Sequence, residues 1–146
     1  MAKTKESSIK SKLKIKKPLK SKSKANNKKL IEVADSLWSK IVKSKDGNKC
    51  INCGKAENLN SHHVIHKSKS KNLRWNPDNG VTLCYACHIH GIHNGSIAVA
   101  KRILDYIGAK KYTELDKLSK QLFKADMNFV IEKLKAEARI NYNLEL

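Results

Sequence analysis

Residues 50–93 decide the fold, and they read CINCGKAENLNSHHVIHKSKSKNLRWNPDNGVTLCYACHIHGIH. This stretch holds all four cysteines and all six histidines of the 146-residue chain. The cysteines form two pairs of equal spacing, Cys50-x2-Cys53 and Cys84-x2-Cys87. Two such pairs offer four thiolates, which suit a closed tetrahedral site for structural zinc. Two disulfides are the alternative, but nothing in the sequence indicates export, and reducing compartments favour metal over disulfides.

Histidines lie between the cysteine pairs and directly after the second pair. His62 and His63 are adjacent, and His88 follows Cys87. Neighbouring residues of a strand point to opposite faces, so one histidine could hold a metal while the other faces an attacking water. A lone histidine is more often a polar surface residue. Six histidines beside a predicted zinc site, in a basic chain, favour chemistry over packing.

The order His62-His63, Asn79, His88 resembles the motif of the HNH (His-Me finger) endonucleases. The resemblance covers roughly residues 48–94. It implies an α+β fold in which a small ββα-metal core is braced by zinc. It also implies an enzyme that hydrolyses phosphodiester bonds of DNA.

The resemblance further implies a role for each residue of the motif. His63 is the general base that activates water, and Asn79 fixes the loop that orients it. His62 and His88 bind the catalytic divalent cation, Mg²⁺ or Mn²⁺. Structural Zn²⁺ is held by the paired cysteines, namely Cys50, Cys53, Cys84 and Cys87.

Residues 45–54, residues 72–79 and the later Tyr106-Ile107-Gly108 resemble the phage NinG/Rap-like recombination nucleases. This narrower resemblance implies branched or structured DNA as substrate, in recombination or repair. The expected location is the cytoplasm, which is that of the host if a phage encodes the protein. His62 and His88 stand where those proteins tend to carry glycine and asparagine. Two other functions stay open: a non-catalytic zinc-knuckle module that binds nucleic acid, and an HNH nuclease of the homing or restriction type.

The remaining histidines have weaker assignments. His93 lies five residues after His88 and could replace or join it at the metal, although His88 already fits the spacing of the motif. His66 and His90 are expected at the surface or in supporting positions.

Positive charge favours a polyanionic partner, because the formal net charge of the chain is +18. Residues 1–29 hold 12 lysines and one acid, Glu6, and therefore carry +11. They lack hydrophobic periodicity, so we expect a disordered cationic arm that attracts DNA phosphates regardless of sequence. A solubilising tail without a partner is the alternative. Further contacts to the DNA backbone are predicted, against the alternative of an ordinary solvated loop, for Lys67, Lys69, Lys71 and Arg74.

Helical periodicity appears on both sides of the central stretch. It predicts one helix from Leu30 to just before Asp46-Gly47, and three more after Ser96. The first of these three helices ends at a Gly108 C-cap, and the second begins at Thr113. The third begins after an Asp126 N-cap. The predicted organisation is a cationic arm, an HNH domain and a helical region, at residues 1–29, 30–95 and 96–146.

The helical region after Ser96 shows no motif for reading DNA. Helix packing explains it as well as self-association into a homodimer does. No apolar run approaches the roughly 20 residues of a membrane span, and the lysine-rich start lacks the apolar segment of a secretory signal. A membrane partner is therefore not expected.

Overall fold

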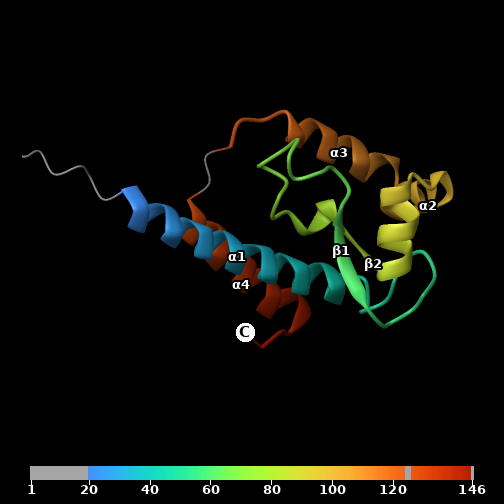
Figure 1. The fold of residues 1–146 in the computed structure, drawn as a ribbon, viewed down its shortest axis with the longest axis horizontal. Coiled ribbons are helices and arrows are strands. Elements are labelled where there is room, and N and C mark those ends of the chain that lie inside the picture. The colour runs from blue at the N-terminus through green and yellow to red at the C-terminus, as the bar shows by residue number, and fades with distance from the viewer. Residues whose placement is uncertain (1–19, 124–125, 146) are drawn as a thin grey trace, which may run out of the picture.

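A computed structural model describes residues 20–123 and 126–145, and it has the predicted α+β fold (Figure 1). A two-stranded sheet lies among helices that come from both ends of the chain. Short 3-10 helices cover Pro77–Asn79 and Ile92–Asn94, and a π-helical turn covers Ala86–Gly91. The longer elements, in order, are α1 (Lys20–Lys45), β1 (Leu59–His63), β2 (Gly80–Cys84), α2 (Ile97–Ile107), α3 (Ala109–Ser119) and α4 (Met127–Tyr142).

Helix α1 begins earlier than the sequence predicts. It starts at Lys20, so the last ten residues of the predicted disordered arm are helical, while residues 1–19 lie outside the described residues. The reason is that a helix with a packed half is already nucleated, and lysine and alanine extend it at little cost. The other end agrees with the prediction, because α1 stops at Lys45 and the chain turns at Asp46-Gly47.

The hairpin lies directly against α1. β1 and β2 are antiparallel, with Leu59 opposite Cys84 and His63 opposite Gly80. Every residue of β2 is buried. A Cβ atom at Gly80 would stand 2.7 Å from the ring of Trp38, closer than real Cβ contacts come, so only glycine lets the strand approach α1 this closely.

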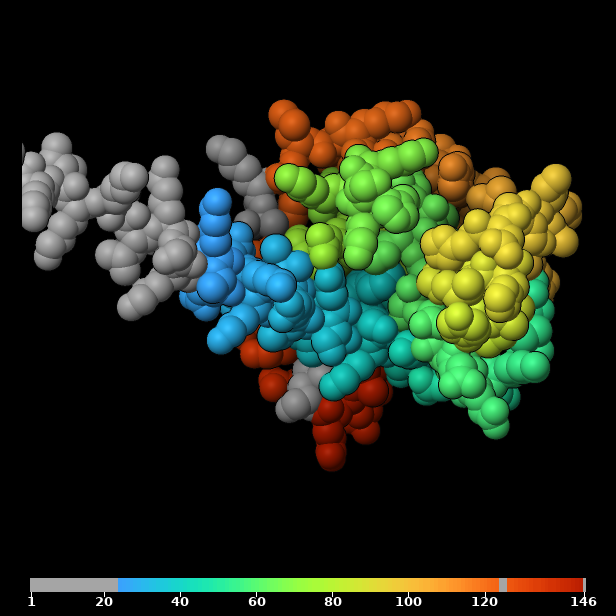
Figure 2. Space-filling view, in the orientation of Figure 1, coloured from blue at the N-terminus to red at the C-terminus, as the bar shows by residue number. Residues whose placement is uncertain are grey.

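Two apolar clusters hold the structure together. The larger one joins α1 to α4 and includes Trp38 and Ile41 from α1. The smaller one joins the hairpin to α2 through Val81, Leu83 and Ile103, and it also contains two of the cysteines. Figure 2 shows α1, blue to cyan, between the green loop that follows β1 and the red α4. Helix α1 therefore contributes to the core and also borders the loop of the candidate site.

The helices after the hairpin have the caps predicted at Gly108 and Asp126 and a further cap at Ser96, and one helix begins earlier than predicted. Ser96 caps α2 through the N–H of Val99, Gly108 ends α2 with φ +83°, and Asp126 accepts hydrogen bonds at the start of α4. Helix α3 begins at Ala109 and not at Thr113, because the chain turns within the single residue Gly108. No helix within residues 20–123 and 126–145 has both the length and the apolar character needed to cross a membrane.

Candidate active site and metal centres

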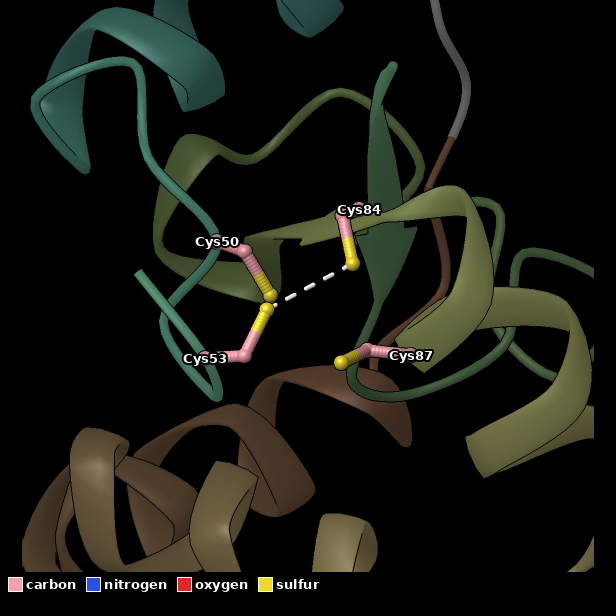
Figure 3. A group of neighbouring side chains, drawn as sticks. All are labelled: Cys50, Cys53, Cys84 and Cys87. Atoms are coloured by element: carbon pink, nitrogen blue, oxygen red, sulfur yellow. Dashed lines mark hydrogen bonds between the residues drawn. The ribbon is translucent and has the colours of Figure 1, made fainter. Parts of the chain in front are cut away.

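The four cysteines converge on one point, although they come from three segments. Cys50 and Cys53 lie in the loop after α1, Cys84 ends β2, and Cys87 lies in the π-helical turn. Their sulfur atoms all lie within 4.8 Å of one another, and the Sγ atoms of Cys53 and Cys84 are 3.6 Å apart (Figure 3). Tetrahedral zinc with Zn–S bonds of about 2.3 Å separates its sulfurs by about 3.8 Å. The four thiols are free, and their spacing fits one zinc ion.

The electrostatics of this cluster also fit a cation. Burial alone would raise the pKa of Cys50, but hydrogen bonds from the backbone of Cys84, Cys53 and Asn52 lower it to about 7. Burial and the neighbouring thiols raise the pKa of Cys87 to about 12, against a hydrogen bond that Asn52 donates to its sulfur at 3.2 Å. One thiolate therefore forms readily, and further negative charge needs a cation to balance it.

A second cluster is made of histidines. The ligand atoms of His62, His88 and His93 lie within 4.8 Å of one another, and the Nε2 atoms of His88 and His93 are 3.2 Å apart. Burial, followed by the proximity of His88 and His93, lowers the pKa of His62 to about 4. Burial and His93 also lower the pKa of His88. The two rings are therefore neutral at pH 7, the state that binds metals.

This cluster fits a divalent cation with open coordination positions. His88 Nδ1 is the one buried side-chain nitrogen or oxygen atom without a hydrogen-bond partner in the described part of the chain. Three imidazoles supply three ligands, and His93 is exposed at the edge of the group. A site with three protein ligands leaves positions for water or substrate, which is typical of catalytic metals.

His93 joins the cluster because of the π-helical turn. In an α-helix, residues five apart point in different directions, whereas residues four apart share a face. Here the N–H of Ile92 donates to the carbonyl of Cys87, five residues back, so the turn holds one more residue than an α-helical turn. His93 consequently reaches His88 despite the five-residue spacing. His90 lies elsewhere, with its ring 5.8 Å from that of Tyr85.

His63 lies on the opposite face of β1 from His62, as expected for neighbours in a strand. Its ring stacks on Trp38, with centroids 3.9 Å apart and an angle of 9° between the planes. In the tautomer that this contact favours, Nε2–H donates to the carbonyl oxygen of Arg74 at 2.8 Å. The other ring nitrogen, Nδ1, has no hydrogen-bond partner among the described residues and is not buried.

Burial sets the charge of His63. It lowers the pKa of the ring, and this effect outweighs the hydrogen bond to the Arg74 carbonyl, which acts in the opposite direction. Neutral His63 therefore presents an open lone pair at Nδ1, the property a general base requires.

Asn79 holds the loop that follows β1. Its side chain is fully buried, and Oδ1 accepts a hydrogen bond from the N–H of Ile65 at 2.8 Å. Its Nδ2 donates to the carbonyl oxygens of Ile65 and Leu73, at 2.9 and 3.2 Å. One amide thus ties together the two ends of the loop that leads to Arg74.

Arg74 pairs with helix α1. Nε of its guanidinium donates to Oδ1 of Asp35 at 3.0 Å and Nη2 donates to Oδ2 at 2.7 Å, and a contact of this side chain with a DNA phosphate stays a prediction. Trp75 Nε1 donates to the same carboxylate at 2.8 Å, which anchors the loop to α1. The predicted lysines of this loop, Lys67, Lys69 and Lys71, are exposed.

These features together define a small α+β domain with one cluster of cysteines and one cluster of histidines, each of which could hold a metal ion. A family model described as HNH endonuclease matches residues 50–91, from the first cysteine to the end of the π-helical turn. This match supports the HNH family for the central segment and, with it, a nuclease that acts on nucleic acid. No curated protein and no solved structure matches the chain. Helices α1, α2, α3 and α4 lie outside the matched residues.

Proposed function

We propose that the protein is a divalent-metal-dependent endonuclease that hydrolyses phosphodiester bonds of DNA. One observation carries the proposal. His63, neutral and held by the Arg74 carbonyl, directly follows His62 of the three-histidine cluster in β1. Consecutive Cα atoms are about 3.8 Å apart, so the side chains of His63, the base, and His62, the metal ligand, are attached to the strand close to each other. A phosphodiester that lies across the end of β1 could contact the base on one face of the strand and the metal on the other.

His63 is the general base in this proposal. Nδ1 takes a proton from a water molecule, and the oxygen of that water bonds to the phosphorus. The P–O bond to the leaving oxygen breaks, and that oxygen takes a proton from solvent water. The Arg74 carbonyl keeps its hydrogen bond to Nε2–H and stabilises the imidazolium that forms. A general base of this kind typically contributes about 10²–10⁴-fold to the rate.

The divalent cation would be held by His62, His88 and His93. When bound, it supplies positive charge that stabilises the scissile phosphate and the leaving oxygen. Imidazole ligands accept Mn²⁺ and other transition metals readily, while Mg²⁺ prefers oxygen, so Mn²⁺ suits the three histidines better than Mg²⁺.

The positive charge of the chain supports DNA as the partner. The exposed Lys67, Lys69 and Lys71 lie between His63 and Arg74 in the sequence, on the loop that Asn79 closes. We propose that they contact the backbone of branched or structured DNA, as the resemblance to recombination nucleases implies. Such contacts are independent of sequence and sensitive to salt.

A cleavage panel tests the proposal. Zinc-loaded protein is incubated with linear duplex, single strand, flap, three-way and four-way junctions and RNA, with Mg²⁺, Mn²⁺ or no added ion. We expect ion-dependent cleavage of DNA, fastest on the branched substrates, and its loss in His63→Ala. His66→Ala is the matched control, because His66 is exposed and its ring forms hydrogen bonds with nearby Ser68. If the wild type binds these substrates but cleaves none of them, the protein is instead a zinc-knuckle binding module.

A further inference from the structure

Helix α1 lies outside the segment that matches the HNH family, yet it touches the surroundings of His63 in two places. The first is Asp35, which accepts three hydrogen bonds. Two come from the guanidinium of Arg74, and the third comes from the indole of Trp75. Burial would raise the pKa of Asp35, but these hydrogen bonds hold it below its usual value, so the carboxylate is charged at neutral pH.

The second contact is Trp38. Its indole ring stacks on His63, and its Nε1–H donates to the carbonyl oxygen of Asn76 at 2.9 Å. Asp35 and Trp38 lie three residues apart on one face of α1. They therefore hold the chain on both sides of Trp75, and the Arg74 carbonyl that receives Nε2–H of His63 belongs to this short segment.

We propose that Asp35 and Trp38 are positioning residues for His63. Asp35 fixes the residue whose carbonyl selects the Nε2–H tautomer, and Trp38 fixes the plane of the ring. The inference rests on the proposed nuclease function, because it takes His63 as the base. It adds that α1, which no motif marks, is part of the catalytic apparatus.

A positioning role differs from a merely stabilising one. The bidentate pair of Asp35 with Arg74 also contributes to folding, but stability alone would change neither kcat nor the tautomer of His63 in a protein that stays folded. The carboxylate of Asp35 also controls the place of one backbone oxygen, and that oxygen controls which nitrogen of His63 carries the proton. Loss of the pair should thus lower the fraction of molecules with a lone pair at Nδ1 and should leave DNA binding intact.

The kinetic test compares Asp35→Asn with Glu32→Gln. Both variants remove one negative charge from the same helix, but Glu32 is exposed and, among the described residues, pairs with Lys28 alone, at 3.9 Å. We expect Asp35→Asn to lower kcat about 10- to 100-fold, as small misplacements of catalytic groups do, with KM and zinc content unchanged. Asp35→Glu should recover part of the loss, and Glu32→Gln should behave as the wild type.

A spectroscopic test needs no cleavage. Nitrogen NMR of the His63 ring should show the Nε2–H tautomer in the wild type and in Glu32→Gln, and a mixture of tautomers in Asp35→Asn. For the stack, Trp38→Phe keeps an aromatic ring in place and should retain most of kcat, whereas Trp38→Leu should lose about 10-fold or more.

The two tests separate the two proposals. If the wild type cleaves nothing while Asp35→Asn changes the tautomer, the nuclease function fails and the control of the His63 ring by α1 stands. If the wild type cleaves and Asp35→Asn matches Glu32→Gln in both kcat and tautomer, the positioning role is wrong.

Discussion

The cysteine cluster and the histidine cluster meet at Cys87 and His88, neighbours in one π-helical turn, yet they suit different tasks. The cysteines supply four ligands with a geometry close to that of a closed zinc site. The histidines supply three ligands, one of them exposed, which leaves room for water and substrate. A zinc ion at the cysteine cluster would therefore hold in place the turn that carries His88 of the histidine cluster.

Loss of zinc should have the largest effect. In Cys87→Ser we expect loss of the zinc ion, unfolding of residues 48–94 and no cleavage, because the binding energy of a structural zinc is also folding energy. Elemental analysis and circular dichroism measure the two effects. His90→Ala, in the same turn, is the control and should keep both zinc and fold. A metal-free protein that stays folded would show that the cysteine cluster does not need zinc to fold.

Loss of the base should leave both metal sites intact. We expect His63→Ala to lower kcat about 10²–10⁴-fold while zinc content and DNA affinity stay at wild-type values. The reason is that His63 faces Trp38, away from the histidine cluster. Single-turnover cleavage and equilibrium DNA binding test this. Cleavage by His63→Ala at the wild-type rate would remove His63 from the mechanism.

Loss of a histidine ligand should change the requirement for the divalent ion. Replacing even an outer-shell partner of a metal ligand typically lowers metal affinity about 10- to 100-fold. Loss of a ligand itself, as in His93→Ala, should therefore raise the ion concentration for half-maximal cleavage by at least about 10-fold. The same holds for His62→Ala and His88→Ala. The zinc content should not change. An unchanged requirement in His93→Ala would show that the π-helical turn does not bring a third ligand.

Removal of residues 1–19 should have the smallest effect. They carry seven lysines and one glutamate, a net charge of +6, and the truncation leaves the described part of α1 whole. We expect weaker DNA binding with a shallower dependence on salt, and unchanged kcat at saturating DNA. Binding measured over a range of salt concentrations tests this, and an identical salt slope would mean that residues 1–19 make no DNA contact.

The sequence was sufficient for features that depend on neighbours in the chain. The paired cysteines, the opposite faces of His62 and His63, and the cap at Asp126 follow from spacing and local hydrogen bonding. Each needs only the periodicity of a strand, a turn or a helix end. These three features were therefore predicted correctly, whereas the start of α3, also a helix end, was predicted at Thr113 and lies at Ala109.

Features that depend on packing could be predicted only in part or not at all. The sequence left open whether His93 joins His88, because that contact needs a π-helical turn, which no residue pattern marks, and an α-helical spacing would put His93 on another face. The pairing of Arg74 with Asp35, 39 residues away, could not be predicted, because only the fold brings the two side chains together. From its helical spacing, Trp38 is predicted to be an ordinary core residue, and only the structure shows that its ring stacks on His63.

One measurement tests most directly that one metal folds the protein and another serves catalysis. Zinc-loaded protein is titrated with Mn²⁺, and bound Mn²⁺ by electron paramagnetic resonance and the DNA cleavage rate are recorded on the same samples. We expect the wild type to bind one Mn²⁺ per chain beside its zinc, with cleavage rising in proportion to that occupancy. The variant with His62, His88 and His93 all changed to alanine should keep zinc and show neither. Full cleavage before any Mn²⁺ binds, or equal Mn²⁺ binding and cleavage in the triple variant, would contradict the account.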